Sequence, residues 1–265
     1  MDRRVHPLRA RFTSHRIATA LALTWLAPAF AGESVSVAAA SNLIYALDAL
    51  NAEFQRAAPA VTVTTTTGAS GSLVAQIGHG APFDVFLSAD LDYPRALIAQ
   101  GQADGKSLRI FASGQLVLWT THPGLALESI PALVRNPSVR KIAVANLATA
   151  PYGRAAQQAL EKLGAWTDAQ PKLVVGENIT QTAQFVATGG ADAGFVALSL
   201  VLAPNLKGTG RWLPVPAGLY APLEHGAVLT VRGAANPAAR RYLEFLSSAA
   251  AKTILRQFGY GVPGR

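Results

Sequence analysis

The stretch VSVAAASNLIYALDAL, residues 35–50, decides the fold. It opens with alternating and then small apolar residues, which indicate a buried strand, and continues with apolar residues at helical spacing. Ser41 and Asn42 lie at the seam between the two patterns. Polar residues at such a seam cap the helix, hold a ligand, or do both. We expect both, because a capped helix start also presents its dipole to a ligand.

The alternation of strand and helix continues along the first half of the chain. Strands are predicted at 35–40, 61–67 and 85–88, and helices at 43–57, 72–77 and 91–99. Strands that alternate with helices over short connections predict an α/β fold with largely parallel sheets and helices on both faces.

A second α/β set follows and predicts a bilobal, Rossmann-like architecture. GQLVLWTT (114–121) and HGAVLTV (225–231) are typical of long strands, and between them we expect strands at 142–144, 173–175 and 193–196 and helices at 154–164 and 180–188. A last amphipathic helix is predicted at 238–258. Two crossover strands would join lobe one (32–115 and 228–265) to lobe two (116–227), with a ligand in the cleft between them.

The N-terminal segment predicts export. Residues 1–16 contain five arginines and one acid, an apolar run spans 17–30, and Ala29-Phe30-Ala31 matches a cleavage site. This pattern is typical of a signal peptide comprising residues 1–31, and it indicates a soluble periplasmic protein. No later stretch offers about 20 uninterrupted apolar residues.

Composition excludes several classes of function. Without residues 1–31 the formal charge falls from +8 to +4 (18 basic minus 14 acidic residues), with no Lys/Arg block that would suggest nucleic acid. The chain has no cysteine, which excludes thiolate metal sites and thiol nucleophiles. His79, His122 and His225 lie far apart in sequence, so a catalytic zinc, or any other metal site, is not expected.

Four predicted helix starts share small and hydroxyl residues. They are Ser41-Asn42, TGASGS (67–72), TAPYG (149–153) and GENIT (176–180). The first amides of a helix are unpaired and carry partial positive charge, so four starts aimed at one point would bind an anion without a lysine. A fully deprotonated oxyanion needs donors only, and Glu177 is the one carboxylate in these turns.

Several of these motifs resemble one family. AAASN (38–42), GASGSLVAQIGHGAPFDVFLSAD (68–90), PYGRAAQQALEKLGAW (151–166) and FGYGVP (258–263) are similar to segments of the periplasmic molybdate-binding proteins of ABC importers, which are type II periplasmic binding proteins. The resemblance spans essentially residues 32–265. It implies that Ser41, Asn42 and Ser70 bind the oxyanion in lobe one, and that main-chain amides of Tyr152 and Ile179 bind it in lobe two.

The sequence departs from that family at one position. Many members supply a tyrosine hydroxyl from the strand that matches GFVALS (194–199), where this chain has Ala197. The Tyr152 hydroxyl, its amide or both are expected to replace it. Asp84 and Asp90 lie in the matched motif, but a carboxylate would repel a dianion, so Asp84 is interpreted as structural and Asp90 as a helix cap or surface group.

The resemblance implies capture rather than catalysis. Molybdate, and tungstate too, would be the ligand, with no cofactor; the protein would be a monomer that delivers its cargo to a membrane permease of an ABC importer. Sulfate or another tetrahedral oxyanion is the alternative, since only cavity size separates sulfate from molybdate. A serine hydrolase is a remote alternative, because GASGS (68–72) only superficially matches the G-x-S-x-G elbow.

Overall fold

Two five-stranded sheets organise the chain, and the structure, a computed structural model, describes residues 1–2 and 33–264. The first sheet has the order β2-β1-β3-β10-β4. Its strands are β1 (Glu33–Ala40), β2 (Val61–Gly68), β3 (Val85–Leu87), β4 (Arg109–Ser113) and β10 (Glu224–Leu229). β2, β1 and β3 are parallel, and β10 runs antiparallel to β3 and β4.

The second sheet repeats this plan in the order β7-β6-β8-β5-β9. Its strands are β5 (Leu116–Thr120), β6 (Ile142–Ala145), β7 (Leu173–Gly176), β8 (Ala193–Ala197) and β9 (Arg211–Pro214). β7, β6 and β8 are parallel, whereas β5 runs antiparallel to β8 and β9. The predicted α/β class is therefore confirmed, with each sheet parallel on one side and antiparallel on the other.

Helices cover both faces of the first sheet. They are α1 (Ile44–Ala57), α2 (Ser70–Gly78), α3 (Asp92–Ala99), α9 (Val231–Ala234), α10 (Pro237–Phe245) and α11 (Ala249–Gln257), with short 3-10 turns η1 (Ser41–Leu43) and η2 (Gly105–Ser107). Alternate residues of a strand point to opposite faces. Accordingly Val37 packs in the cluster that includes α1, α10 and α11, and Ala38 packs with α2 and α3.

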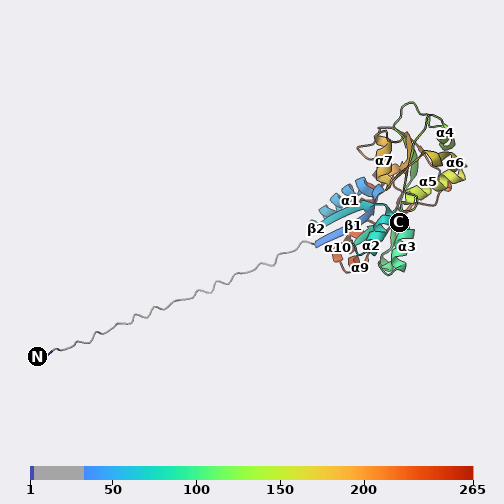
Figure 1. The fold of residues 1–265 in the computed structure, drawn as a ribbon. Coiled ribbons are helices and arrows are strands. Elements are labelled where there is room, and N and C mark those ends of the chain that lie inside the picture. Colours follow the sequence, from blue (N-terminus) through green and yellow to red (C-terminus); the bar gives the residue numbers. More distant parts are fainter. Residues whose placement is uncertain (3–32, 265) are drawn as a thin grey trace. The chain divides into compact units, whose positions relative to one another are not determined.

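The second sheet carries a further set of helices. They are α4 (Ile130–Arg135), α5 (Pro151–Lys162), α6 (Trp166–Ala169), α7 (Ile179–Ala187) and α8 (Leu198–Val201), with η3 (Gln170–Lys172) and η4 (Ala217–Leu219). All four residues of β6 are buried, so this sheet too is covered on both faces. Figure 1 shows the two resulting lobes, one with α4–α7 and one that contains both β1 and the helices α9 and α10 from near the C-terminus.

The crossovers differ from the sequence prediction in detail. The strand predicted at residues 114–121 is β5, which covers Leu116–Thr120 and lies wholly in the second sheet; β4 of the first sheet ends at Ser113, and Gly114 and Gln115 link the two. The chain is back in the first sheet by Glu224, four residues before the expected return at Val228. Strands β4 and β9 were not predicted from the sequence pattern.

The last predicted helix, residues 238–258, is in fact two helices. α10 ends at Phe245, and α11 begins at Ala249 after Ser248, whose hydroxyl accepts a hydrogen bond from the amide of Ala251. A serine that caps a new helix start explains the break inside a continuous amphipathic pattern. The long helix predicted from that pattern is wrong.

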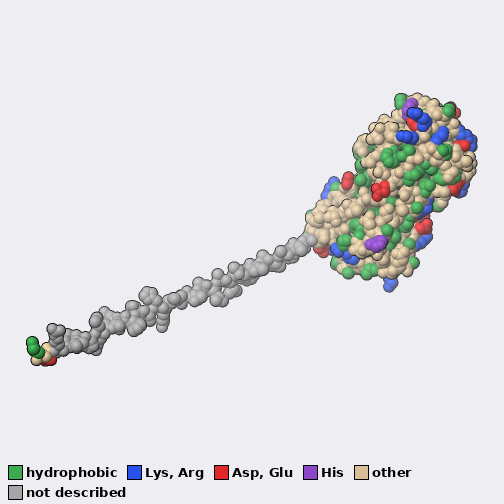
Figure 2. Space-filling view, in the orientation of Figure 1, with side chains coloured by type: hydrophobic (Ala, Val, Ile, Leu, Met, Phe, Trp, Pro, Cys, Tyr) green, Lys and Arg blue, Asp and Glu red, His purple; other side chains and the backbone are tan. Residues whose placement is uncertain are grey.

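Residues 33–264 form one compact unit, and the predicted signal peptide, residues 1–31, lies outside the described residues apart from Met1 and Asp2. None of the helices in the described part of the chain is long and apolar enough to cross a membrane. Figure 2 shows basic and acidic side chains intermixed over the visible face of residues 33–264, without a patch of one sign.

Candidate functional site

A small cavity lies between the two lobes, where the carboxyl ends of the parallel strands meet. The space open to the centre of a water-sized sphere is about 10 Å³, enough for about one water and far below the roughly 300–1,000 Å³ of typical pockets for organic ligands. All five residues predicted to bind the ligand line it, and each is at most 4% exposed. The lining residues are Ala40, Ser41, Asn42, Gly68, Ala69, Ser70, Ala89, Ala150, Pro151, Tyr152 and Ile179.

Four helix starts reach this cavity, two from each lobe. Ser41 begins η1 directly after β1, and Ser70 begins α2 after β2. From the second lobe, Tyr152 is the second residue of α5 and Ile179 is the first residue of α7. Amides at these positions have no partner inside their own helix, so both lobes present hydrogen-bond donors to the same space.

Three of these helix starts lack a side-chain cap. No side chain caps η1, α2 or α5. At α7 the Asn178 side chain accepts from the amides of Thr180 and Gln181, which leaves the amide of Ile179 outside the cap. The partial positive charge of these helix ends is therefore available to a bound anion.

The expected capping by Ser41 and Asn42 is wrong. Neither side chain makes a capping hydrogen bond at η1 or α1. Within residues 33–264, no hydrogen bond engages the Ser41 hydroxyl. Because the helix does not use this hydroxyl, it remains a donor at the cavity wall.

Ser70 has an oriented hydroxyl. Its Oγ accepts a hydrogen bond of 3.2 Å from the amide of Ala89, another residue of the cavity wall. A hydroxyl that already accepts from the protein has its own proton left to donate. The residue is 1% exposed, so its donor is directed within a closed site.

Asn42 belongs to a buried network that the sequence did not reveal. Its Nδ2 lies 2.8 Å from Nε2 of His225 and donates to the Tyr260 hydroxyl at 2.8 Å. The Tyr260 hydroxyl donates to the Asn42 carbonyl, and Ser199 Oγ donates to the same carbonyl at 3.0 Å. The Asn42 Oδ1 is buried without a partner, so this cavity residue also carries one free acceptor.

His225 is neutral within this network. Its Nδ1 lies 3.0 Å from the carbonyl of Leu223 and must donate to it, so Nε2 is left as the acceptor for Asn42. Burial lowers the pKa of His225 to about 4. FGYGVP (258–263) was noticed in the sequence as a motif, but nothing in it indicated that Tyr260 reaches Asn42.

The Tyr152 hydroxyl reaches the first crossover, where it lies beside Gly114. Its hydroxyl is buried without a hydrogen-bond partner. Its ring contacts that of His225 edge to face, with centroids 6.3 Å apart. Burial raises the pKa of Tyr152 well above its ordinary value, so the phenol stays protonated.

Direct contacts between the lobes close the cavity. The amide of Gly71 donates to the carbonyl of Thr149 at 2.9 Å, and the Thr180 hydroxyl donates to the carbonyl of Ser41 at 2.9 Å. Ser199, which follows β8, adds its bond to Asn42. Both walls are therefore held together by groups that flank the cavity.

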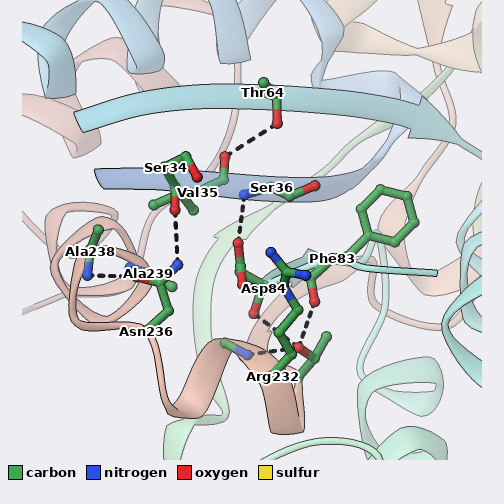
Figure 3. A network of polar contacts seen from close by, with 12 residues as sticks. Ser34, Val35, Ser36, Thr64, Phe83, Asp84, Arg232, Asn236, Ala238 and Ala239 are labelled. Atoms are coloured by element: carbon green, nitrogen blue, oxygen red, sulfur yellow. Dashed lines mark hydrogen bonds and ion pairs between the residues drawn. The ribbon is translucent and has the colours of Figure 1, made fainter. Parts of the chain in front are cut away.

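The two carboxylates of the matched motif lie outside the cavity lining. Figure 3 shows the Asp84 carboxylate accepting from the amide of Ser36 at 2.8 Å and from Nε of Arg232 at 3.0 Å, which is the structural role expected of it. Asp90 is neither the helix cap nor the surface group expected of it, because the N-cap of α3 is Leu91, without a side-chain capping bond, and Asp90 is buried. It accepts from the amide of Tyr93 and pairs with Arg154 of the other lobe. No signal in the sequence predicted that pair.

No formal charge lines the cavity. In the described part of the chain, no three His, Asp or Glu side chains are grouped so as to hold a metal ion. What the walls offer is a set of main-chain amides and hydroxyls on buried residues, which suits a small anion stabilised by hydrogen bonds. Two α/β lobes that enclose such a cavity define a solute receptor.

Comparison with known proteins agrees with this class. Residues 35–261 match the family model described as bacterial extracellular solute-binding protein. The chain is 37% identical over 251 residues to the molybdate-binding protein ModA of Azotobacter vinelandii, covering 95% of this chain and 99% of the relative. It is 39% identical over 253 residues to the molybdate-binding protein ModA of Rhodobacter capsulatus, covering 96% of each.

A solved structure is similar over the same region. The periplasmic molybdate-binding protein of Azotobacter vinelandii superposes with a TM-score of 0.81 at 34% identity, covering 87% of this chain and all of that one. The chain therefore belongs to the bacterial extracellular solute-binding proteins, and the bilobal fold expected from the resemblance is confirmed.

Proposed function

We propose that this protein captures molybdate, and tungstate as well, in the cavity between its lobes and delivers it to the permease of an ABC importer. The observation that carries the proposal is that the cavity is lined by uncapped helix starts from both lobes and by no formal charge. Two relatives at 37% and 39% identity that are named molybdate-binding proteins support the choice of cargo.

In this proposal each lobe supplies part of the coordination. Ser41 and Ser70 donate their hydroxyls and main-chain amides from the first lobe, and Asn42 joins them with its main chain. Tyr152 and Ile179 donate main-chain amides from the second lobe. Hydrogen bonds to an ionised oxygen are roughly twice as strong as neutral ones, so several of them replace a positively charged side chain.

Opening and closing of the lobes would admit and retain the ligand. We propose hinges at Gly114–Gln115 and in the return segment 215–223, which lie between strands of the two sheets. The lobes would be close to 32–115 with 228–265, and 116–227. A ligand that contacts both walls favours the closed form, because only that form makes all the contacts.

The working location would be the periplasm, reached through cleavage of the leader after Ala31, and the receptor would act as a monomer without catalysing a reaction.

A serine hydrolase is not favoured by the contacts of Ser70. Its Oγ accepts from the amide of Ala89. The nitrogens of His225 are engaged by Asn42 and Leu223, and Nδ1 of His122 accepts from the amide of Gly124.

Isothermal titration of the purified protein with molybdate, tungstate, sulfate and phosphate tests the proposal. Saturable one-to-one binding of molybdate that survives excess sulfate is the expected result. Phosphate belongs in the set because the unpartnered Asn42 Oδ1 is an acceptor, which the proton of monohydrogen phosphate would use. If sulfate or phosphate bound as strongly as molybdate, the proposed ligand would change to that anion. No heat with any of the four would overturn the assignment of an oxyanion ligand.

A further inference from the structure

Beside the cavity lies a charged cluster that joins the lobes without lining the cavity. Asp90 follows β3 in the first lobe, directly after the wall residue Ala89, and Arg154 lies two residues after the wall residue Tyr152 in α5. The Arg154 guanidinium donates to Oδ2 of Asp90. The Asp90 side chain is 10% exposed and that of Arg154 is 33% exposed.

Tyr93, at the start of α3, completes this cluster. The Arg154 guanidinium donates to its hydroxyl at 2.9 Å, and its guanidinium carbon lies 5.0 Å from the ring centroid. The same hydroxyl donates to the carbonyl of Ala148 in the second lobe at 3.0 Å. Asp90 and Tyr93 of the first lobe thus bind both the Arg154 side chain and the backbone of the second lobe.

The helix alone gives no reason for an arginine at this position. Arg154 lies in the first turn of α5, where the helix dipole disfavours a cation. Asp90 offsets that charge, and it is itself fixed: its Oδ1 accepts from the amide of Tyr93 at 3.2 Å and from the hydroxyl of Ser88 at 3.0 Å. The carboxylate is therefore held in place by residues of its own lobe, independently of Arg154.

We propose that Arg154 is a positioning residue for ligand retention. In the closed form it compensates the buried carboxylate of Asp90, and without it closure of the lobes would leave that charge buried without a partner. This inference rests on the proposed function, since it concerns how long the same cavity stays closed. Removal of one partner of a buried ion pair is much more costly than removal of both, because the remaining charge has no partner.

This asymmetry gives a distinctive pattern of variants. Arg154→Gln should weaken molybdate binding by about 10- to 100-fold, mainly through faster dissociation, because the open form lets Asp90 return to water. Asp90→Asn should bind within about threefold of the wild type, since an amide needs no counter-charge. The double variant should recover most of the affinity that Arg154→Gln loses.

Matched controls are available in the same chain. Arg135 pairs with Asp168 within the second lobe, and both side chains are about half exposed, so Arg135→Gln should leave binding unchanged. Since the chain has no cysteine, Lys106→Cys and Thr167→Cys, one in each lobe, can carry a dye pair for fluorescence energy transfer. This pair reports closure with and without ligand.

The experiment combines titration, stopped-flow dissociation and energy transfer on the wild type and the variants. The proposal is supported if Arg154→Gln loses molybdate affinity and the double variant recovers it. Energy transfer should also show that the lobes of the Arg154→Gln protein are further apart than those of the wild type. Wild-type affinity in Arg154→Gln overturns it, and so does an equal loss in the double variant, which would mean that Arg154 acts on the anion directly. If the wild type binds no oxyanion, the proposed function fails. The role of Arg154 in closure is then judged from the difference in energy transfer between the wild type and Arg154→Gln alone.

Discussion

The phenolic oxygen of Tyr152 occupies the space that a side chain at Gly114 would need: a Cβ built on Gly114 would lie 2.0 Å from that oxygen and 2.8 Å from Cε1 of His225. Gly114 is the link between β4 and β5, where the chain passes from one sheet to the other. The tyrosine therefore connects the cavity wall to a crossover, and the contact requires glycine there.

Tyr152→Phe tests whether the hydroxyl serves the ligand. The hydroxyl is buried without a partner beside Gly114, so its removal relieves a desolvation penalty of about 1–3 kcal/mol. We expect the molybdate dissociation constant to stay within about threefold and the melting temperature to hold or rise. Tyr220→Phe is the control, because the Tyr220 hydroxyl accepts from the amide of Leu116 and its loss should destabilise. A loss of binding in Tyr152→Phe would instead assign the phenol to the oxyanion.

Local patterns predicted most strands and helices of the core, because burial on both faces imposes regular spacing. β1, β2 and α1 were predicted within two residues at each end. α5 begins three residues before its predicted start. Pro151 was interpreted as lying before the helix, but proline is favourable at the first position of a helix. β9 was missed because it forms the edge of the second sheet, where three of its four residues are exposed and no buried pattern marks the strand.

The predicted site residues come together because they all follow parallel strands, a relationship that sequence order encodes. The residues behind them follow no such rule. His225 and Tyr260 reach Asn42 from 183 and 218 residues away, and Arg154 reaches Asp90 across 64 residues. The first two contacts depend on how distant segments of the first lobe pack, and the third depends on how the two lobes meet, so no local pattern in the sequence indicates them.

Ser70→Ala should weaken molybdate binding about tenfold or more, because it removes a charge-assisted hydrogen bond from a closed site. It also leaves the amide of Ala89 without its partner, so a stability loss of about 1–3 kcal/mol is expected as well. Ser107→Ala is the matched control: the Ser107 hydroxyl is equally committed, to Asp104 and Leu229, but lies away from the cavity. Equal affinity in the two variants would remove Ser70 from the site.

Gly71→Ala should hold the lobes apart. In the closed form a Cβ on Gly71 would lie 2.5 Å from the Tyr93 hydroxyl and 3.1 Å from Cα of Thr149 in the other lobe. The tyrosine end could move, but the backbone of Thr149 could not move without opening the cleft. We expect at least tenfold weaker binding with unchanged thermal stability of the ligand-free protein. Gly218→Ala, which meets nothing within 4 Å, should bind normally. Unchanged affinity in Gly71→Ala would contradict this closed geometry.

The buried imidazole of His225 makes stability depend on pH in a defined window. The pKa is lowered by burial from 6.5 to about 4, so between these values the unfolded chain binds a proton that the folded protein does not. The free energy of unfolding should therefore be unaffected above about pH 6.5, fall as the pH drops towards 4, and level off below it.

The full loss from this residue would be about 3 kcal/mol, from the difference of 2.5 between the two pKa values at 1.36 kcal/mol each. Urea unfolding of the wild type and of His225→Gln across pH 4–7 measures it, since the glutamine carbonyl can still accept from Nδ2 of Asn42 but does not titrate. The variant should lose part of the acid-side slope, and His79→Gln, at an exposed position, is the control for the loss of a histidine. Carboxylates also titrate in this window, so the quantity to compare is the difference between variant and wild type. Parallel curves for the wild type and His225→Gln would mean that His225 accepts its proton without unfolding, and that Asn42 is then oriented by something other than a neutral imidazole.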